Sequence, residues 1–137
     1  MDEQPSARKN PLLGLRQRRS MSPVARAWIT IAETPRYQAE AGKLLSEEEQ
    51  QAVTEMIARD PTCGEVMEGT GGVRKVRFAL SGRGKSGGAR VIYYFHSDVM
   101  PAYLLSIFGK NQKGNLTKAE RNTLARLVEM LKHAHGR

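Results

Sequence analysis

One basic stretch, Gly71 to Phe95, most constrains how this chain can fold. It contains six basic residues and no acidic residue. Two runs rich in Val, Ile, Phe and Tyr flank a segment of Gly and Ser, which is the pattern of a β-hairpin. A sheet surface that carries only positive charge is costly unless it faces something negative. We therefore expect this hairpin to form the working surface of the protein.

Side-chain alternation divides the hairpin into two faces, because neighbouring residues of a strand point to opposite sides. One face is apolar and is expected to pack on the core: Val76, Phe78, Val91 and Tyr93. The other face combines three cations with a phenol: Lys75, Arg77, Arg90 and Tyr94. The strands are expected over residues 73–80 and 88–95.

The remaining elements predict an α+β fold. A short strand is expected at residues 27–31, and Thr34-Pro35 predicts the start of a helix. Capping boxes at Ser46–Glu49 and Thr117–Glu120 each open another helix. With a further strand at 102–108, the order is β-α-α-β-β-β-α. This order predicts a mostly antiparallel sheet with the helices packed on one face.

The length of 137 residues suits one domain, which we place at residues 25–137. Residues 1–24 contain three prolines and no apolar period, so they predict a disordered basic tail. Alternatively, Met21 is the true start and the preceding residues are an upstream extension. The net charge of +8 favours a polyanion or an acidic protein as partner. A single cysteine, with no apolar run or signal peptide, favours the cytoplasm over secretion or a membrane.

Two apparent sites in the sequence are discounted. Gly82–Gly87 matches the GxGxxG dinucleotide pattern, but a strand follows where that pattern requires a helix. A flexible hairpin tip is the simpler interpretation, although its Arg83 and Lys85 can still contact phosphates. The histidines and the one cysteine have no ligand spacing, so neither a metal site nor a cofactor is expected.

A face with Lys, Arg and Tyr but no carboxylate suits a phosphodiester, because nucleic-acid affinity comes largely from cations on phosphates. Arg77 and Arg90 are candidates for charge stabilisation, Lys75 for proton transfer, and Tyr94 for stacking or proton transfer. Binding alone and catalysis both fit this composition. Further candidates for RNA contact are the other basic or polar residues near the hairpin: Arg74, Arg83, Lys85, Lys110, Asn111 and Lys113.

Three segments carry a family resemblance. They read GTGGVRKVR at 69–77, GKSGGARVIYY at 84–94 and KNQK at 110–113. Together they resemble the RelE/ParE toxin superfamily, and most closely its RelE-type, HigB-like branch, over about residues 26–132. The resemblance implies a toxin of a type II toxin–antitoxin system, which enters the ribosome and cuts mRNA without a metal. It also implies an antitoxin with a helix-turn-helix domain, through which the pair binds operator DNA.

The resemblance extends to single residues. Lys75 and Arg77 match the paired basic positions of the first hairpin strand, and Arg90 matches an arginine of the next. Lys110, or alternatively Lys113, matches a basic residue after the last strand. The family's tyrosine near the C-terminus has no counterpart, which leaves Tyr94 as a stand-in. Two other functions stay open: a ParE-like inhibitor of DNA gyrase, and a degenerate toxin that binds only antitoxin and DNA.

Overall fold

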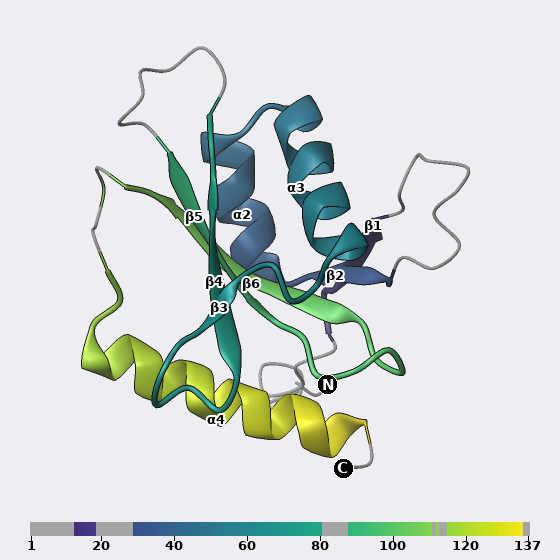
Figure 1. The fold of residues 1–137 in the computed structure, drawn as a ribbon, viewed down its shortest axis with the longest axis vertical. Helices are drawn as coiled ribbons and strands as arrows, with labels where there is room; N and C mark the ends of the chain where they lie inside the picture. The colour runs from purple at the N-terminus through teal and green to yellow at the C-terminus, as the bar shows by residue number, and fades with distance from the viewer. Residues whose placement is uncertain (1–12, 19–28, 81–87, 111, 113–114, 136–137) are drawn as a thin grey trace, which may run out of the picture.

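The computed structural model describes residues 13–18, 29–80, 88–110, 112 and 115–135. In this part of the chain, three helices accompany a six-stranded sheet of order β1-β2-β6-β5-β4-β3 (Figure 1). The strands are β1 (Arg16–Arg18), β2 (Ile31–Glu33), β3 (Glu65–Val66), β4 (Val73–Phe78), β5 (Ala89–Tyr94) and β6 (Ala102–Gly109). The helices are α2 (Pro35–Leu44), α3 (Glu47–Arg59) and α4 (Lys118–Ala134).

The sheet is mostly antiparallel, as the sequence predicts. Among the described strands only β2 and β6 pair in parallel, and every other neighbouring pair is antiparallel. The β5–β6 ladder contains one irregularity, where Ile92 pairs with Ser106 but Tyr93 pairs with Leu104. Leu105 is therefore an extra residue on β6, which is a β-bulge. The α+β class and the order of the predicted elements are confirmed.

The helices begin where the capping residues predict. Thr34 caps α2 by accepting a hydrogen bond from the Tyr37 amide, and Pro35 follows at the first helical position. Ser46 and Thr117 each form a complete capping box with the glutamate three residues later. These caps satisfy amides that have no partner inside a helix. They fix the starting points of all three helices against the sheet.

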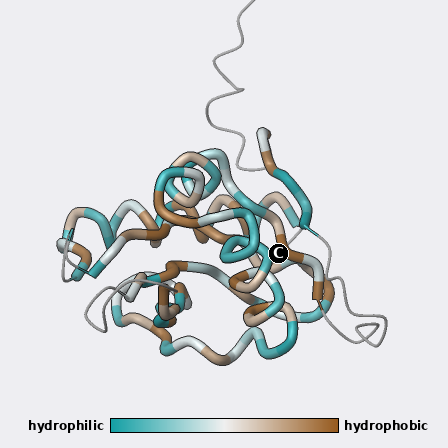
Figure 2. The backbone as a smooth tube through the Cα atoms, turned by 90° about the horizontal axis from the view of Figure 1, so that it is seen from above, coloured by the Kyte–Doolittle hydropathy of each residue, from teal (hydrophilic) through white to brown (hydrophobic). Residues whose placement is uncertain are grey.

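The helices cover both faces of the sheet, so the prediction that all of them pack on one face is wrong. Helices α2 and α3 pack against one face, which includes Val76, Phe78, Val91 and Tyr93 as predicted. Helix α4 crosses the other face and buries its own apolar stripe there: Leu124, Val128 and Leu131. In Figure 2 the hydrophobic segments run through the middle of the molecule, between hydrophilic outer turns. Strands β5 and β6 are consequently buried on both sides.

Strand β1 lies within residues 1–24, for which the sequence predicts no regular structure. It pairs with β2, which begins at Ile31, where the predicted strand ends. The side chain of Glu33 on β2 is fully buried, and two arginines of β1 neutralise it. Arg16 Nη2 lies 2.6 Å from Glu33 Oε1, and Arg18 Nε lies 2.8 Å from Glu33 Oε2. A buried carboxylate requires such partners, so Glu33 ties β1 to the domain.

Substitution of Arg18 by Met should strongly destabilise the protein. Arg18 is only 12% exposed and also bonds Glu47, so its loss leaves Glu33 short of a buried partner. Breaking a buried ion pair from one side costs about 3 kcal/mol or more of unfolding free energy. The matched control is Lys132→Met, which removes a 3.9 Å pair with exposed Glu129 and should cost less than about 1 kcal/mol. Urea denaturation of both variants measures the difference, and equal losses would contradict the role given to Glu33.

Candidate functional site

The face of the sheet under α4 carries three rows of side chains that run across β4, β5 and β6. The rows are Arg77–Arg90–Phe108, Lys75–Ile92–Ser106 and Val73–Tyr94–Tyr103. We call them the cation row, the middle row and the covered row. Helix α4 packs on the covered row, which is buried throughout, whereas Arg77 at one end of the cation row is exposed. The register thus places Lys75, Arg77 and Arg90 on one face, as the alternation predicts.

The two arginines of the cation row converge over Gly88. A Cβ atom added to Gly88 would lie 3.8 Å from Arg77 Nε and 3.8 Å from Arg90 Nη1. Both guanidinium groups therefore lie above the same glycine, which has no side chain to separate them. Arg90 Nη1 also donates to the Ala89 carbonyl at 3.4 Å. The sequence predicts a shared face for these two arginines, and the structure adds that they are direct cross-strand neighbours.

Glu65 of β3 lies opposite Lys75, but the cross-strand neighbours of the two arginines are each other and Phe108, so no carboxylate of the described strands lies opposite either arginine. Among the described residues, no ion pair joins a carboxylate to Lys75, Arg77 or Arg90. Like charges directly opposite one another on neighbouring strands are destabilising. Two guanidinium groups side by side match the several oxygens of one phosphate, since each offers forked donors. The arrangement fits an external phosphate group that neutralises both arginines at once.

Tyr94 does not lie beside the arginines, although the sequence places it there. It shares their face but belongs to the covered row, about 13 Å along β5 from Arg90. Only 2% of it is exposed, and its hydroxyl lies 3.4 Å from His96 Nδ1. Burial, together with the charge of Glu129, raises the pKa of Tyr94. A ring buried in this way cannot stack on a base from solution.

The other predicted RNA contacts divide into three groups. Arg74 lies on the opposite face, where its Nη1 donates to the Gly64 carbonyl at 2.7 Å and fixes the turn before β3. Lys110 is exposed just beyond β6, and its amide donates to the Gly88 carbonyl at 2.9 Å. That bond brings Lys110 to the end of the sheet that holds the arginine pair. The remaining four lie outside the described residues: Arg83, Lys85, Asn111 and Lys113.

A polar network that the sequence does not signal lies at the other end of the middle row. Glu40 of α2 accepts hydrogen bonds from Ser106 Oγ at 2.8 Å and from the Ile107 amide at 3.1 Å. Its second oxygen pairs with Arg36 Nε at 3.1 Å. Glu40 thus supplies a hydrogen-bond acceptor to the edge of β6 beyond Leu104, the last residue that pairs with β2. No local pattern predicts this contact, because it depends on α2 lying along that edge.

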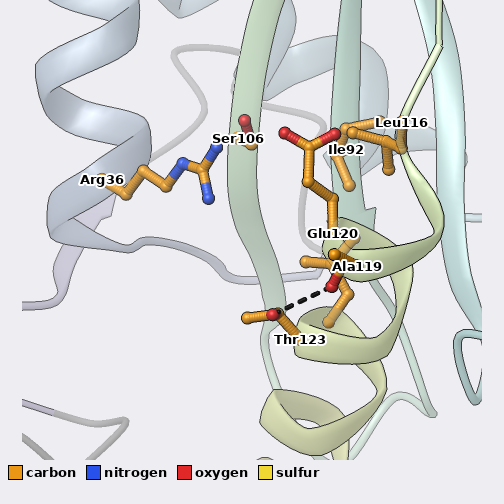
Figure 3. Close-up of a pocket in the computed structure, with 8 residues that line it drawn as sticks. Arg36, Ile92, Ser106, Leu116, Ala119, Glu120 and Thr123 are labelled. Atoms are coloured by element: carbon orange, nitrogen blue, oxygen red, sulfur yellow. Dashed lines mark hydrogen bonds between the residues drawn. The ribbon is translucent and has the colours of Figure 1, made fainter.

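A cavity of about 160 Å³ lies between α2, β6 and the first turns of α4 (Figure 3). Ile92 and Ser106 of the middle row form part of its wall, so it neighbours the row of Lys75.

Within the described part of the chain, no group of three His, Cys, Asp or Glu residues is placed to hold a metal ion. No helix there is both long and apolar enough to cross a bilayer.

The sequence matches the model of a known protein family. The model of the family described as "RelE toxin of RelE / RelB toxin-antitoxin system" matches residues 38–136. The match begins within α2 and covers β4, β5, β6 and α4, and therefore all three rows. It leaves out β1 and β2, including the Glu33 cluster.

No tyrosine of the folded protein should be available as a phenolate base. Burial is the main cause that raises the pKa of all four: Tyr37, Tyr93, Tyr94 and Tyr103. Each folded-state pKa lies above the unfolded value of about 10. The free energy of unfolding that these raised pKa values contribute is therefore fully present below about pH 10. It is lost as the pH rises through the pKa values of the folded state. Absorbance titration should show phenolate appearing together with alkaline unfolding. A tyrosine that ionises reversibly near pH 10 in the folded state would contradict this.

Proposed function

The chain belongs to the RelE toxin family of toxin–antitoxin systems, and on that premise we propose that it is a ribosome-dependent endoribonuclease. Its substrate is mRNA, and cleavage inhibits translation. The observation that carries the proposal is the arginine pair of the cation row, whose two guanidinium groups lie together over Gly88 without a carboxylate partner in the described structure. Such a pair suits the phosphate at a cleavage point.

The proposed reaction uses the 2′-hydroxyl of RNA as nucleophile. Its oxygen forms a bond to phosphorus while the bond from phosphorus to the 5′-oxygen breaks, which leaves a cyclic phosphate and a 5′-hydroxyl. Arg77 and Arg90 stabilise the negative charge that develops on the phosphate oxygens, a role that a metal ion has in other nucleases. Lys75, in the next row, supplies the proton for the departing 5′-oxygen. The proton of the nucleophile passes to water.

The composition of this face supports the proposal that cleavage depends on the ribosome. Its described residues supply cations for the phosphate but place no carboxylate beside the arginine pair to act as base. Correct alignment of the RNA must then contribute more of the rate, because orientation alone supplies a large part of many rate enhancements. We propose that the small ribosomal subunit provides this alignment, with Lys110 holding mRNA or ribosomal RNA. The toxin is accordingly expected in the cytoplasm.

Membership of the family implies an antitoxin as partner. We propose that this antitoxin carries a helix-turn-helix domain and recruits the toxin to operator DNA. The net charge of +8 favours an acidic antitoxin segment that covers the cation row. In that case the acidic side chains of the antitoxin would neutralise the arginine pair in place of the RNA phosphate.

Charge removal at the arginine pair should abolish cleavage. In a translation extract, wild-type protein should cut the message at positions that primer extension maps. Arg77→Gln and Arg90→Gln should each lower the cleavage rate about 100-fold, as expected for loss of one group that stabilises a transition state. The matched control is Arg59→Gln at the end of α3, which removes the same charge from an exposed position on the opposite side of the sheet and should change the rate little.

Two outcomes would overturn the proposal. The first is a message that stays intact while translation is inhibited. The second is inhibition of DNA supercoiling by gyrase with no effect on translation, which would support a gyrase inhibitor on the same fold. Full activity of both arginine variants would leave cleavage in place but remove the arginine pair from it.

A further inference from the structure

The ladder between β5 and β6 continues for one residue pair beyond the ends of both strands. Ala89 pairs with Gly109, and the Lys110 amide donates to the Gly88 carbonyl at 2.9 Å, so Lys110 is the cross-strand neighbour of Gly88. Gly88 lies two residues before Arg90 and therefore on the same face of the sheet. Cross-strand neighbours also share a face. The side chain of Lys110 thus starts on the face of the cation row, with its Cα about 5.5 Å from that of Gly88.

The space above Gly88 is bordered by three cations. Arg77 Nε and Arg90 Nη1 each lie 3.8 Å from the position that a Cβ atom of Gly88 would take. Lys110 borders the same space from the side of β6. A phosphate group has enough oxygens to contact all three, and contacts between ionised groups are the strongest hydrogen bonds. Lysine is a point charge on a flexible stem, so its contribution depends on where its backbone is held.

Gln112 holds the backbone beside Lys110. Its side-chain Oε1 accepts a hydrogen bond from the Gly109 amide at 2.6 Å. Its own amide donates to the Gly109 carbonyl at 2.9 Å. Both polar groups of Gly109, the residue directly before Lys110, are therefore bound to Gln112, while the amide of Lys110 is bound to Gly88. The turn after β6 is consequently fixed at Lys110 and at the residue before it.

The side chain of Gln112 has no part in either hydrophobic cluster, and the residue is exposed. Its bond to the Gly109 amide is therefore a local tie and not a consequence of core packing. Glycine has more backbone freedom than any other residue, so a turn that contains Gly109 needs such a tie to keep one conformation. Without it, rotation at Gly109 would carry Lys110 away from Gly88.

We propose that Gln112 is a positioning residue of the phosphate site. It holds Lys110 above Gly88, where the lysine binds phosphate together with Arg77 and Arg90. This inference rests on the proposed function, in which the cation row binds the RNA backbone. Gln112 itself makes no contact with the RNA in this arrangement. A neutral side chain thereby controls an ionic contact, and this property distinguishes the proposal from a purely structural role.

The salt dependence of RNA binding tests the proposal. The slope of log affinity against log salt concentration counts phosphate contacts, at about 0.7 for each contact on a single strand. The probe is a 2′-O-methyl RNA oligomer, which cannot be cleaved because the nucleophile is blocked. Gln112→Met keeps the length of the side chain but removes its carbonyl acceptor. It should lower the magnitude of the slope by about 0.7, as much as Lys110→Met does, although it removes no charge.

A double variant shows whether Gln112 acts through Lys110. Gln112→Met should change neither the slope nor the rate of mRNA cleavage further when Lys110→Met is already present. In a translation extract, each single variant should cleave about tenfold more slowly, because a displaced cation stabilises the transition state less. Thermal unfolding of Gln112→Met should match wild type, since the side chain is exposed.

The matched control is Gln38→Met. Gln38 also binds backbone, because its Nε2 donates to the carbonyls of Gly14 and Glu33, but these bonds lie beside β1 and β2. Its loss should leave the salt slope of RNA binding unchanged. A lowered slope in this control would mean that any lost glutamine tie has the same effect, and it would contradict a specific role for Gln112.

Three results would overturn the positioning role. They are an unchanged slope in Gln112→Met, an unchanged slope in Lys110→Met, and an effect of Gln112→Met that is the same with and without Lys110. In each case a slope lowered by Arg77→Gln would still support the cation row of the proposed function. Conversely, wild-type protein that shows all the expected slopes but leaves mRNA intact in the extract would support the role of Gln112 and refute cleavage.

Discussion

Burial of β5 and β6 on both sides is the constraint on which the rest of this structure depends. Their side chains pack against α2 and α3 on one face and against α4 on the other. Strand β4 lies one position further out and is only partly covered, so it can carry charge. The cation row is found where the cover of α4 ends. The same packing that stabilises the domain thus leaves one patch of sheet open, and cations occupy that patch.

Much of this arrangement follows from the sequence, because it depends on local patterns. The alternation in β4 and β5 correctly places Lys75, Arg77 and Arg90 on one face, and the capping boxes correctly open the helices. The side on which α4 packs does not follow, since an amphipathic helix fits any apolar surface of suitable shape. The packing side of α4 also explains why the prediction for Tyr94 fails. Alternation gives its face correctly, but only the position of α4 shows that this part of the face is buried.

Long-range partners account for the features that the sequence does not predict. Glu33 resembles an ordinary polar residue at a strand end, and nothing near it in the chain indicates that Arg16 and Arg18 neutralise it. Ser106 is unremarkable within an apolar strand until Glu40 is placed beside it. Both contacts join elements whose mutual position is set by tertiary packing. Sequence periodicity cannot predict such contacts, because it depends only on residues within one helix or strand.

The bulge at Leu105 has a consequence for comparing this chain with its relatives. Alternation acts as a reading frame for the two faces of a strand, and one extra residue shifts that frame. Without the bulge, Tyr103 and Ser106 would point to opposite sides; with it, they lie under the same helix as Phe108. In a relative that lacks the extra residue, an ungapped alignment would match Ser106 and Phe108 with residues of the wrong face. A gap placed at position 105 is therefore a structural requirement when these positions are traced through the family.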